Sequence, residues 1–548
     1  MHEPFDAAAP AAGGSAPVPA PPFHKPTQKL YEVRRAELLL AAVSLPLMFF
    51  AVLSFWAGFR FGFTAAYLLV FAVLTAYLCR GAKRPGAFSL ISGILGPALG
   101  CVYLCSDNGA VLFLAVPLLA ALTSAFMAGL AGRKMPDGDL GPAAFAAEPF
   151  AEAVAAAPRS VRSVFSAKGK RGARVGKAAL GVLAALPVFI AVMALLKRSD
   201  AAFEGLIGKI ISEPALRAAQ LVLALLLTPL LLGYAFSLKQ DDRPERLKKE
   251  GKGIETLTLV SGMALLCAAY LLYLFSQLAY FFSGFMGILP PDAGFSTAEY
   301  ARRGFFELCV IAAINFAVLF FVLLFSRKKE GKLPVALRVP AVFIVCFSLL
   351  LICVAISKLL LYIRTYGLTT LRLGTASFAI FLAVVFLALG LRLFIPRVKV
   401  LSVALPAAAC VLLALGFADM NRAAATYNYN RYVENGVGEL DIEYFGSLGG
   451  SGMEVLVRLA DDGNAEVREE ARRTLWYALS DYYIVDVEWS GDKAVKAALG
   501  EKRETGLLSY CVPRARAYRA IGDFLDSHPS YLLDMAKKED FPVWAEDW

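Results

Sequence analysis

The sequence contains very little histidine and no cluster of metal-binding residues. Its three histidines are His2, His24 and His528, and none of them falls in an apolar segment. Histidine is a usual ligand of zinc and of haem iron, so histidine-ligated haem and the common zinc sites are excluded from the apolar part of the chain. We also find no nucleophile elbow and no phosphate loop with the required spacing. The sequence offers no candidate catalytic residue, and we expect no metal and no cofactor.

Cysteines placed to form a disulfide framework are also missing. Eight of the nine cysteines lie within or beside apolar runs, and only Cys511 falls in the polar C-terminal part. A lone cysteine there has no intramolecular partner.

Charged residues are scarce as well. They make up 18% of the 548 residues, whereas 58% are hydrophobic and the mean hydropathy is +0.60. An average soluble domain has roughly 45–50% apolar residues. Apolar runs of about 18 or more residues recur over the first three quarters of the chain, which is long enough to cross a bilayer as helices. They lack the alternation of barrel strands. The fold class is therefore predicted as all-α, a polytopic membrane protein.

The apolar runs predict about eleven spans. Their approximate limits are 37–58, 62–79, 86–105, 109–131, 176–196, 214–237, 255–282, 303–325, 339–357, 375–395 and 400–418.

Lysine and arginine are concentrated before the first span and after every even-numbered one, which by the positive-inside rule places the N-terminus in the cytoplasm. With an odd number of spans, the C-terminal part lies outside the bacterial cytoplasmic (inner) membrane. Residues 421–548 contain 15 Lys/Arg and 23 Asp/Glu, so the basic residues belong mostly to cytoplasmic loops. The excess positive charge indicates topology and contact with membrane lipid, and no nucleic-acid partner is expected.

Three regions follow from this pattern. Residues 1–30 are rich in Ala and Pro and are expected to form a disordered cytoplasmic arm. Residues 31–419 form the transmembrane domain, which includes a basic cytoplasmic loop at 132–175. Residues 420–548 form an extracytoplasmic α-helical domain. Within it, residues 461–479 carry apolar side chains at helical spacing and resemble one unit of a HEAT-like array.

The segment STAEYARRGFFELCVIAAIN, residues 296–315, places four charges at the start of a span. Ser296 and Glu299 match a capping box, and Glu299, Arg303 and Glu307 follow each other at i, i+4 spacing. Arg302 points elsewhere. An interfacial cap with snorkelling arginines explains this pattern. Because the segment faces outward, against the charge bias, a docking site for an anionic group or an acidic surface is the alternative.

Two other outward-facing segments add polar residues. The seventh span carries the stripe Tyr273, Gln277 and Tyr280, and the segment SKLLLYIRTYGLTTLRLG between spans nine and ten carries Arg364 and Arg372. That second segment is expected either to lie in the membrane interface as an amphipathic helix or to be partly re-entrant, with Gly367 as the break.

Three motifs, AEYARRGFFEL, YGLTTLRL and YNYNRYVENGVGELDIEYFGSL, resemble the bacterial domain-of-unknown-function family 4173 and its relative, family 4153. The resemblance extends from about Gly262 to Leu459, with weaker similarity in the earlier spans. It implies a polytopic protein with a polar stretch after the last span, and it implies no known activity. The chain departs from the family in GSLGGSG, where we expect a loop with Ser451 as a helix N-cap in preference to an anion-binding nest.

Together these segments predict a docking site on the outer face for a protein partner or a small ligand. The candidate residues are Tyr273, Gln277, Tyr280, Glu299, Tyr300, Arg302, Arg303, Glu307, Arg364, Tyr366, Arg372, Asn428, Arg431 and Asp441.

Three functions fit this pattern, and the first is preferred. It is a non-catalytic envelope sensor or scaffold. A transporter is the alternative, for which Gln220, Gln277 and Asn315 are the mid-membrane polar candidates. A lipid-linked glycosyltransferase fits less well, because the first outer loop, AGFRFG, contains no acidic residue.

Overall fold

The structure is a computed structural model. It describes residues 30–79, 84–166, 192, 214–240, 253–286, 305–327, 333–435, 440–490, 493–503 and 506–538. The predicted N-terminal arm lies almost wholly outside these residues.

Nine helices in the described residues are long and apolar enough to cross a membrane. They coincide with nine of the predicted spans and are α1 (Arg35–Trp56), α2 (Phe61–Cys79), α3 with α4 (Ala87–Gly100 and Val102–Cys105), α5 (Gly109–Leu130), α9 (Pro214–Lys239), α10 (Thr256–Met286), α13 (Val335–Tyr366), α14 (Thr370–Phe394) and α15 (Val400–Phe417). The prediction of an all-α polytopic membrane protein is confirmed.

Two predicted spans are not among these nine. The predicted span 176–196 lies outside the described residues, apart from Val192. The predicted span 303–325 corresponds to α12 (Phe305–Phe325), of which Val310–Phe325 is recognised as a shorter apolar helix. The number eleven therefore stays a prediction.

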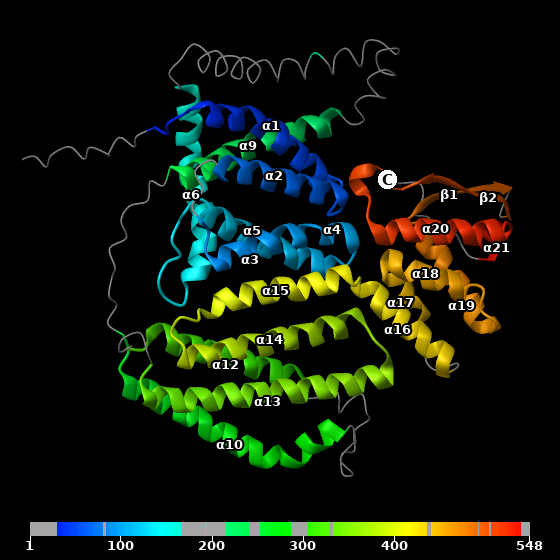
Figure 1. Ribbon diagram of the computed structural model, residues 1–548. Helices are drawn as coiled ribbons and strands as arrows, with labels where there is room; N and C mark the ends of the chain where they lie inside the picture. The colour runs from blue at the N-terminus through cyan, green and yellow to red at the C-terminus, as the bar shows by residue number, and fades with distance from the viewer. Residues whose placement is uncertain are drawn as a thin grey trace, which may run out of the picture.

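The spanning helices pack in two groups that α15 joins (Figure 1). The helices α10, α12, α13 and α14 share one hydrophobic core, in which Leu337, Ile344 and Phe386 are fully buried. The helices α1, α2, α5 and α9 share a second core with α6 (Gly141–Phe165). Helix α15 packs against α14 on one side and against α3 and α5 on the other.

Helix α6 lies within the segment that was predicted as a basic loop. It packs along α9 and also contacts α5. The two helices approach closely at Gly233 of α9, where an added Cβ would stand 2.4 Å from the backbone oxygen of Ala153. Small residues allow such close backbone contact between membrane helices. This part of the loop is thus an element of the bundle core.

Ion pairs connect the helices at the end of the bundle where α1 begins. Glu37 accepts a hydrogen bond from Lys239 at 2.9 Å, which joins α1 to α9. Asp139, just before α6, accepts two bonds from Arg392 of α14, at 2.6 and 3.3 Å. Both partners of this second pair are buried, and the pair directly links the two helix groups.

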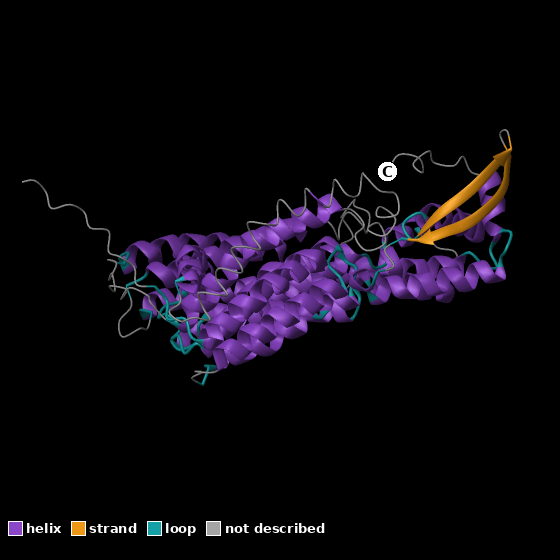
Figure 2. Cartoon of the chain, turned by 90° about the horizontal axis from the view of Figure 1, so that it is seen from above, coloured by secondary structure: helices purple, strands orange, loops and turns teal. Residues whose placement is uncertain are grey.

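A C-terminal domain sits at the opposite end of the bundle (Figures 1 and 2). Its core includes the buried side chains of Leu456, Leu475, Ile521 and Phe524. Its helices are α16 (Met420–Asn435), α17 (Ile442–Ser447), α18 (Gly449–Leu459), α19 (Ala465–Leu479), α20 (Val512–Ser527) and α21 (Tyr531–Lys538), with the short 3₁₀ turn η1 (Leu507–Ser509) before α20. The predicted helix at 461–479 is α19, and the HEAT-like assignment stays a prediction.

A β-hairpin interrupts the predicted all-helical tail. Strand β1 (Tyr483–Ser490) pairs antiparallel with β2 (Lys493–Lys502), and Val485 lies opposite Leu499. Along β1, exposed Ile484, Asp486 and Glu488 alternate with less exposed residues, which is the period-two pattern of a half-buried strand. The hairpin extends away from the bundle (Figure 2).

We expect the Asp139→Asn substitution to lower the melting temperature of the detergent-purified protein clearly. It leaves the Arg392 guanidinium buried without its charged partner, a change that typically costs about 3–5 kcal/mol. The matched control is Lys496→Ala, which removes an exposed pair with Glu488 and is expected to change nothing measurable. Equal melting temperatures for both variants would contradict the linking role of Asp139.

Candidate functional site

Half of the predicted docking residues cannot be placed with their side chains. Glu299, Tyr300, Arg302 and Arg303 lie outside the described residues, together with most of the capping-box segment. The structure describes the backbone of the helices that carry Gln277, Tyr280 and Glu307, but not these side chains. Tyr273 is described, and its ring packs edge-on against Phe347 inside the bundle, at 6.2 Å between centroids.

The structure brings most of the remaining predicted residues together at the turn between α13 and α14. Gly367 ends α13 with φ +79° and ψ 178°, a conformation that is essentially restricted to glycine. The Asn428 side chain on α16 bonds both backbone groups of the following residue, Leu368, as a neighbouring β-strand would. Its Oδ1 accepts from the Leu368 N–H and its Nδ2 donates to the Leu368 carbonyl, both at 2.8 Å.

Two predicted arginines bind backbone carbonyls at the same turn. Arg372 donates to the carbonyls of Tyr366 and Gly367, at 2.9 and 2.5 Å. Arg431 of α16 donates to the Thr365 carbonyl at 2.6 Å. The C-terminus of a helix carries unsatisfied carbonyls and partial negative charge, so cations are stabilised there. These contacts give Arg372 and Arg431 a structural role at the end of α13.

The other predicted residues lie at the edge of this cluster. Asp441 caps α17 by accepting from the Tyr444 N–H at 2.9 Å, and the Tyr444 hydroxyl accepts from the Thr370 N–H at 2.8 Å. Arg364 is exposed. The segment between spans nine and ten is not a separate helix, since it continues α13 to a tight turn and then enters α14. We call the contacts of Thr365–Thr370 with α16 and α17 the turn cluster.

A second polar cluster, which the sequence did not predict, joins the membrane helices to the C-terminal domain. Its centre is Asp107, in the loop between α4 and α5. The carboxylate accepts from the Gly450 N–H at 2.9 Å and from the Asn421 side chain at 2.9 Å. The Asn421 oxygen in turn accepts from the Asn108 side chain at 2.7 Å. Gly450 is in the first turn of α18, so Asp107 supplies the negative charge that a helix N-terminus favours.

Asp419 extends this cluster to a second helix start. It has φ +52°, an uncommon conformation that Asp tolerates better than most residues. Its Oδ1 accepts from the Arg422 N–H at 3.2 Å and so caps α16. Its Oδ2 accepts from the Ser451 hydroxyl at 2.5 Å. We call Asp107, Asn108, Asp419, Asn421, Gly450 and Ser451 the junction network.

The prediction that Ser451 is a helix N-cap was wrong. Ser451 lies inside α18 and is buried, and Leu448 occupies the N-cap position without a side-chain hydrogen bond. The anion at this helix start comes from Asp107, 343 positions earlier in the chain.

The charges around the junction network do not fully compensate its two carboxylates. Burial raises the pKa of both Asp107 and Asp419 above the ordinary carboxyl value, and their mutual repulsion raises that of Asp107 further. Hydrogen bonds from Gly450 and Asn421 act in the opposite direction on Asp107. The nearby ionic side chains on the packed elements are Arg422 on α16, Glu454 on α18 and Arg516 on α20, with Arg422 and Arg516 both within 4 Å of Glu454.

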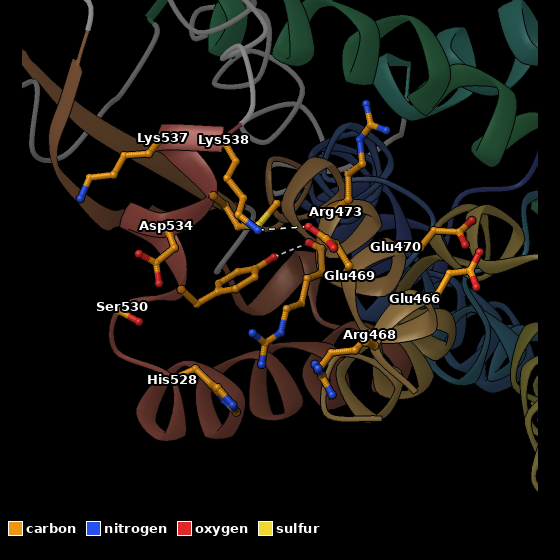
Figure 3. A pocket seen from close by; sticks show the side chains of 14 residues that line it. Glu466, Arg468, Glu469, Glu470, Arg473, His528, Ser530, Asp534, Lys537 and Lys538 are labelled. Carbon is orange, nitrogen blue, oxygen red and sulfur yellow. Dashed lines mark hydrogen bonds and ion pairs between the residues drawn. The ribbon is translucent and has the colours of Figure 1, made fainter. Parts of the chain in front are cut away.

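A charged groove lies on the C-terminal domain, between α19 and α21 (Figure 3). Its volume is about 860 Å³. Lys538 reaches across it and pairs with Glu469 at 3.1 Å. The buried Tyr531 donates to the Arg472 carbonyl at 2.7 Å and joins the two walls. Side chains of both signs of charge line the groove. Its exposed lining includes Glu466, Glu469, Glu470, Asp534, Lys537 and Lys538.

In a comparison with protein families, residues 91–459 match the domain of unknown function DUF4153. This is well over half of the chain. The protein belongs to the DUF4153 family. Comparison with curated proteins and comparison with solved structures both give no match. The DUF4153 region ends at Leu459, as the resemblance predicted, and it also covers earlier spans from residue 91 on, where the resemblance was weaker. A relation to family 4173 stays a prediction.

The DUF4153 region contains the whole junction network and the whole turn cluster, whereas the groove lies beyond its end. In the residues that the structure describes, there is no group of three or more His, Cys, Asp or Glu that could hold a metal ion.

We expect Gly367→Ala to destabilise the protein, since the conformation of this residue costs a non-glycine residue about 1–3 kcal/mol. The added Cβ would also stand 2.6 Å from Asn428 Oδ1 and disturb both of its bonds to Leu368. The control is Gly374→Ala in α14, where a Cβ meets nothing within 4 Å. Melting in detergent should show a loss for the first variant alone, and a loss of equal size in both would contradict the role of the turn cluster.

The junction network should make stability depend on pH. Because the folded pKa of Asp107 and Asp419 is raised, the folded protein binds these protons more tightly than the unfolded chain. The resulting stability is complete below the ordinary carboxyl pKa of 3.8 and is lost as the pH rises through the raised values. Melting temperatures measured from pH 4 upward should therefore show a smaller decline in Asp107→Asn than in the unaltered protein. Parallel curves would contradict the assignment.

Proposed function

We propose that this protein is a non-catalytic sensor or scaffold of the bacterial cytoplasmic membrane, whose C-terminal domain lies on the extracytoplasmic side and docks a partner. The observation that carries the proposal is the charged groove between α19 and α21, presented by a domain that is anchored to the membrane bundle. The anchoring supports this role. A docking surface can hold a partner at a set position, or pass a signal on, only when its domain is fixed to the membrane helices.

The composition of the groove favours a protein segment as the partner. Its walls carry both signs of charge, with Glu466 and Glu470 on α19 and Lys537 on α21 (Figure 3). A small anion or cation would be repelled by one of these sets, whereas a peptide with alternating charges can pair with both. Charge complementarity of this kind contributes mainly to specificity and to the rate of association.

Transport is the alternative, and the polar residues within the membrane give it little support. Asn315 on α12 is buried; Tyr270 of α10 donates to its side-chain oxygen, and its amide donates to Ser348 of α13 at 2.8 Å. Such bonds hold neighbouring membrane helices together. Gln220 is buried and accepts from Arg217 of its own helix at 3.0 Å. The side chain of Gln277 lies outside the described residues.

The glycosyltransferase alternative gains no support either. The turn between α1 and α2 contains no acidic residue, and its Arg60 binds Cys511 of the C-terminal domain at 3.4 Å.

A photo-crosslinking amino acid at Glu470 tests the docking proposal in living cells. We expect a discrete protein adduct from this position, and a large reduction of that adduct when Lys537→Glu is introduced on the opposite wall. The control position is Ile484, which is exposed on the hairpin away from the groove and should give no such adduct. The same adduct from both positions, or no effect of Lys537→Glu, would contradict docking in the groove.

The side of the membrane is tested with the same residue. A Glu470→Cys variant should react with a membrane-impermeant maleimide in intact cells. Protection in intact cells with reaction after lysis would place the domain in the cytoplasm instead.

A further inference from the structure

The segment before α20 lies against the end of two membrane helices. The Phe61 N–H donates to the Tyr510 carbonyl at 3.0 Å, and a Cβ added to Gly62 would stand 3.1 Å from Leu508. Helix α1 ends at Trp56 and α2 begins at Phe61, so this turn marks the membrane boundary on the side of the C-terminal domain. The segment therefore lies at the level of the lipid head groups.

Apolar side chains at this level are exposed on both sides of the contact. Leu507 is 72% exposed and Tyr510 46%, while Phe55 and Trp56 at the end of α1 are 52% and 53% exposed. Tryptophan and tyrosine are enriched where membrane proteins meet the head-group region. We call these four exposed residues, two before α20 and two at the end of α1, the apolar rim.

A small cavity with two cationic side chains lies directly behind this rim. Its volume is about 150 Å³, and it is lined by Lys502, Ser509, Tyr510, Arg514 and Tyr518, among others. The Lys502 ammonium is 5.4 Å from the centroid of the Tyr518 ring. Arg514 is held in place by its bond to the Asp481 carbonyl at 2.6 Å. Lysine and arginine are the usual partners of phosphate oxygens.

The back wall of the cavity is closed by Cys511. This residue is buried and accepts a hydrogen bond from Arg60 at 3.4 Å. Burial raises the pKa of its thiol, so the group stays protonated and serves as packing. The charged chemistry of the cavity thus comes from Lys502 and Arg514.

We propose that this cavity binds the phosphate of a phospholipid head group, with Leu507 and Tyr510 inserted among the lipids beside it. The apolar rim selects a lipid over a free phosphate, because a soluble anion gains nothing from exposed leucine and tyrosine. Bound lipid adds an attachment of the C-terminal domain to the membrane surface itself, separate from the groove between α19 and α21.

The test places a photo-crosslinking amino acid at Tyr510 of the full-length protein in nanodiscs of phosphatidylglycerol and phosphatidylethanolamine. Mass spectrometry should detect a covalent phospholipid adduct. Lys502→Ala should lower its yield about tenfold, the loss expected for one charge-assisted hydrogen bond to phosphate. Lys496→Ala, which removes an exposed lysine from the middle of the same strand, is the control and should leave the yield unchanged.

Two further measurements distinguish a phospholipid head group from free inorganic phosphate as the ligand. Leu507→Ser leaves the cavity intact and should still reduce the adduct, because it removes the apolar contact. Millimolar inorganic phosphate should not compete with the lipid. An unchanged adduct in Lys502→Ala, or full competition by inorganic phosphate, would overturn the proposal.

Discussion

One partly buried carboxylate, that of Asp107, joins the start of a helix in the C-terminal domain to the membrane helices. Asp107 sits in a short loop at the end of the bundle and supplies the negative charge for the first turn of α18, through the Gly450 N–H. A helix start offers several unpaired N–H groups, and burying them without an acceptor is costly. Here the acceptor comes from the membrane part, so neither part is complete without the other. Asn421 binds the second oxygen of Asp107 and the Leu448 carbonyl, which ties the loop, α16 and the entry to α18 together.

The domain is attached at three places that surround the end of the bundle. The junction network lies beside the α4–α5 loop, the turn cluster joins α13 and α14 to α16, and the segment before α20 rests on the α1–α2 turn. A domain held at one point can rotate about it, whereas three separated contacts determine its orientation. This geometry explains why polar residues gather at this end of the molecule. It also suits a protein whose C-terminal surface must keep a set distance from the membrane.

The fold was largely predictable from the sequence. Of the candidate site, some residues of the turn cluster could be named in advance, but their contacts could not. Long apolar runs identify spans because a bilayer leaves few other ways to satisfy the backbone, and nine helices follow them. Asn428, Arg431 and Arg372 were singled out as docking candidates, and their role in docking stays a prediction. The groups they bind in the structure are backbone carbonyls and amides, which carry no sequence pattern. Asp107 could not be predicted, since its partner Gly450 is 343 positions away and only the packed fold brings them together. The hairpin could have been found from the alternation of apolar and charged residues in β1, in the run Val485, Asp486, Val487 and Glu488.

The DUF4153 match separates the membrane bundle and its contacts with the C-terminal domain from the groove and the cavity. The matched residues 91–459 include the spans from α3 to α15, the turn cluster and all of the junction network. Helices α19 to α21, the groove and the cavity beside η1 lie beyond Leu459. The matched region thus supplies the membrane bundle and the support, and the surfaces proposed to meet a partner and a lipid belong to the part that follows. In both proposals the recognition surfaces belong to residues 460–548, and the family region positions them at the end of the membrane bundle.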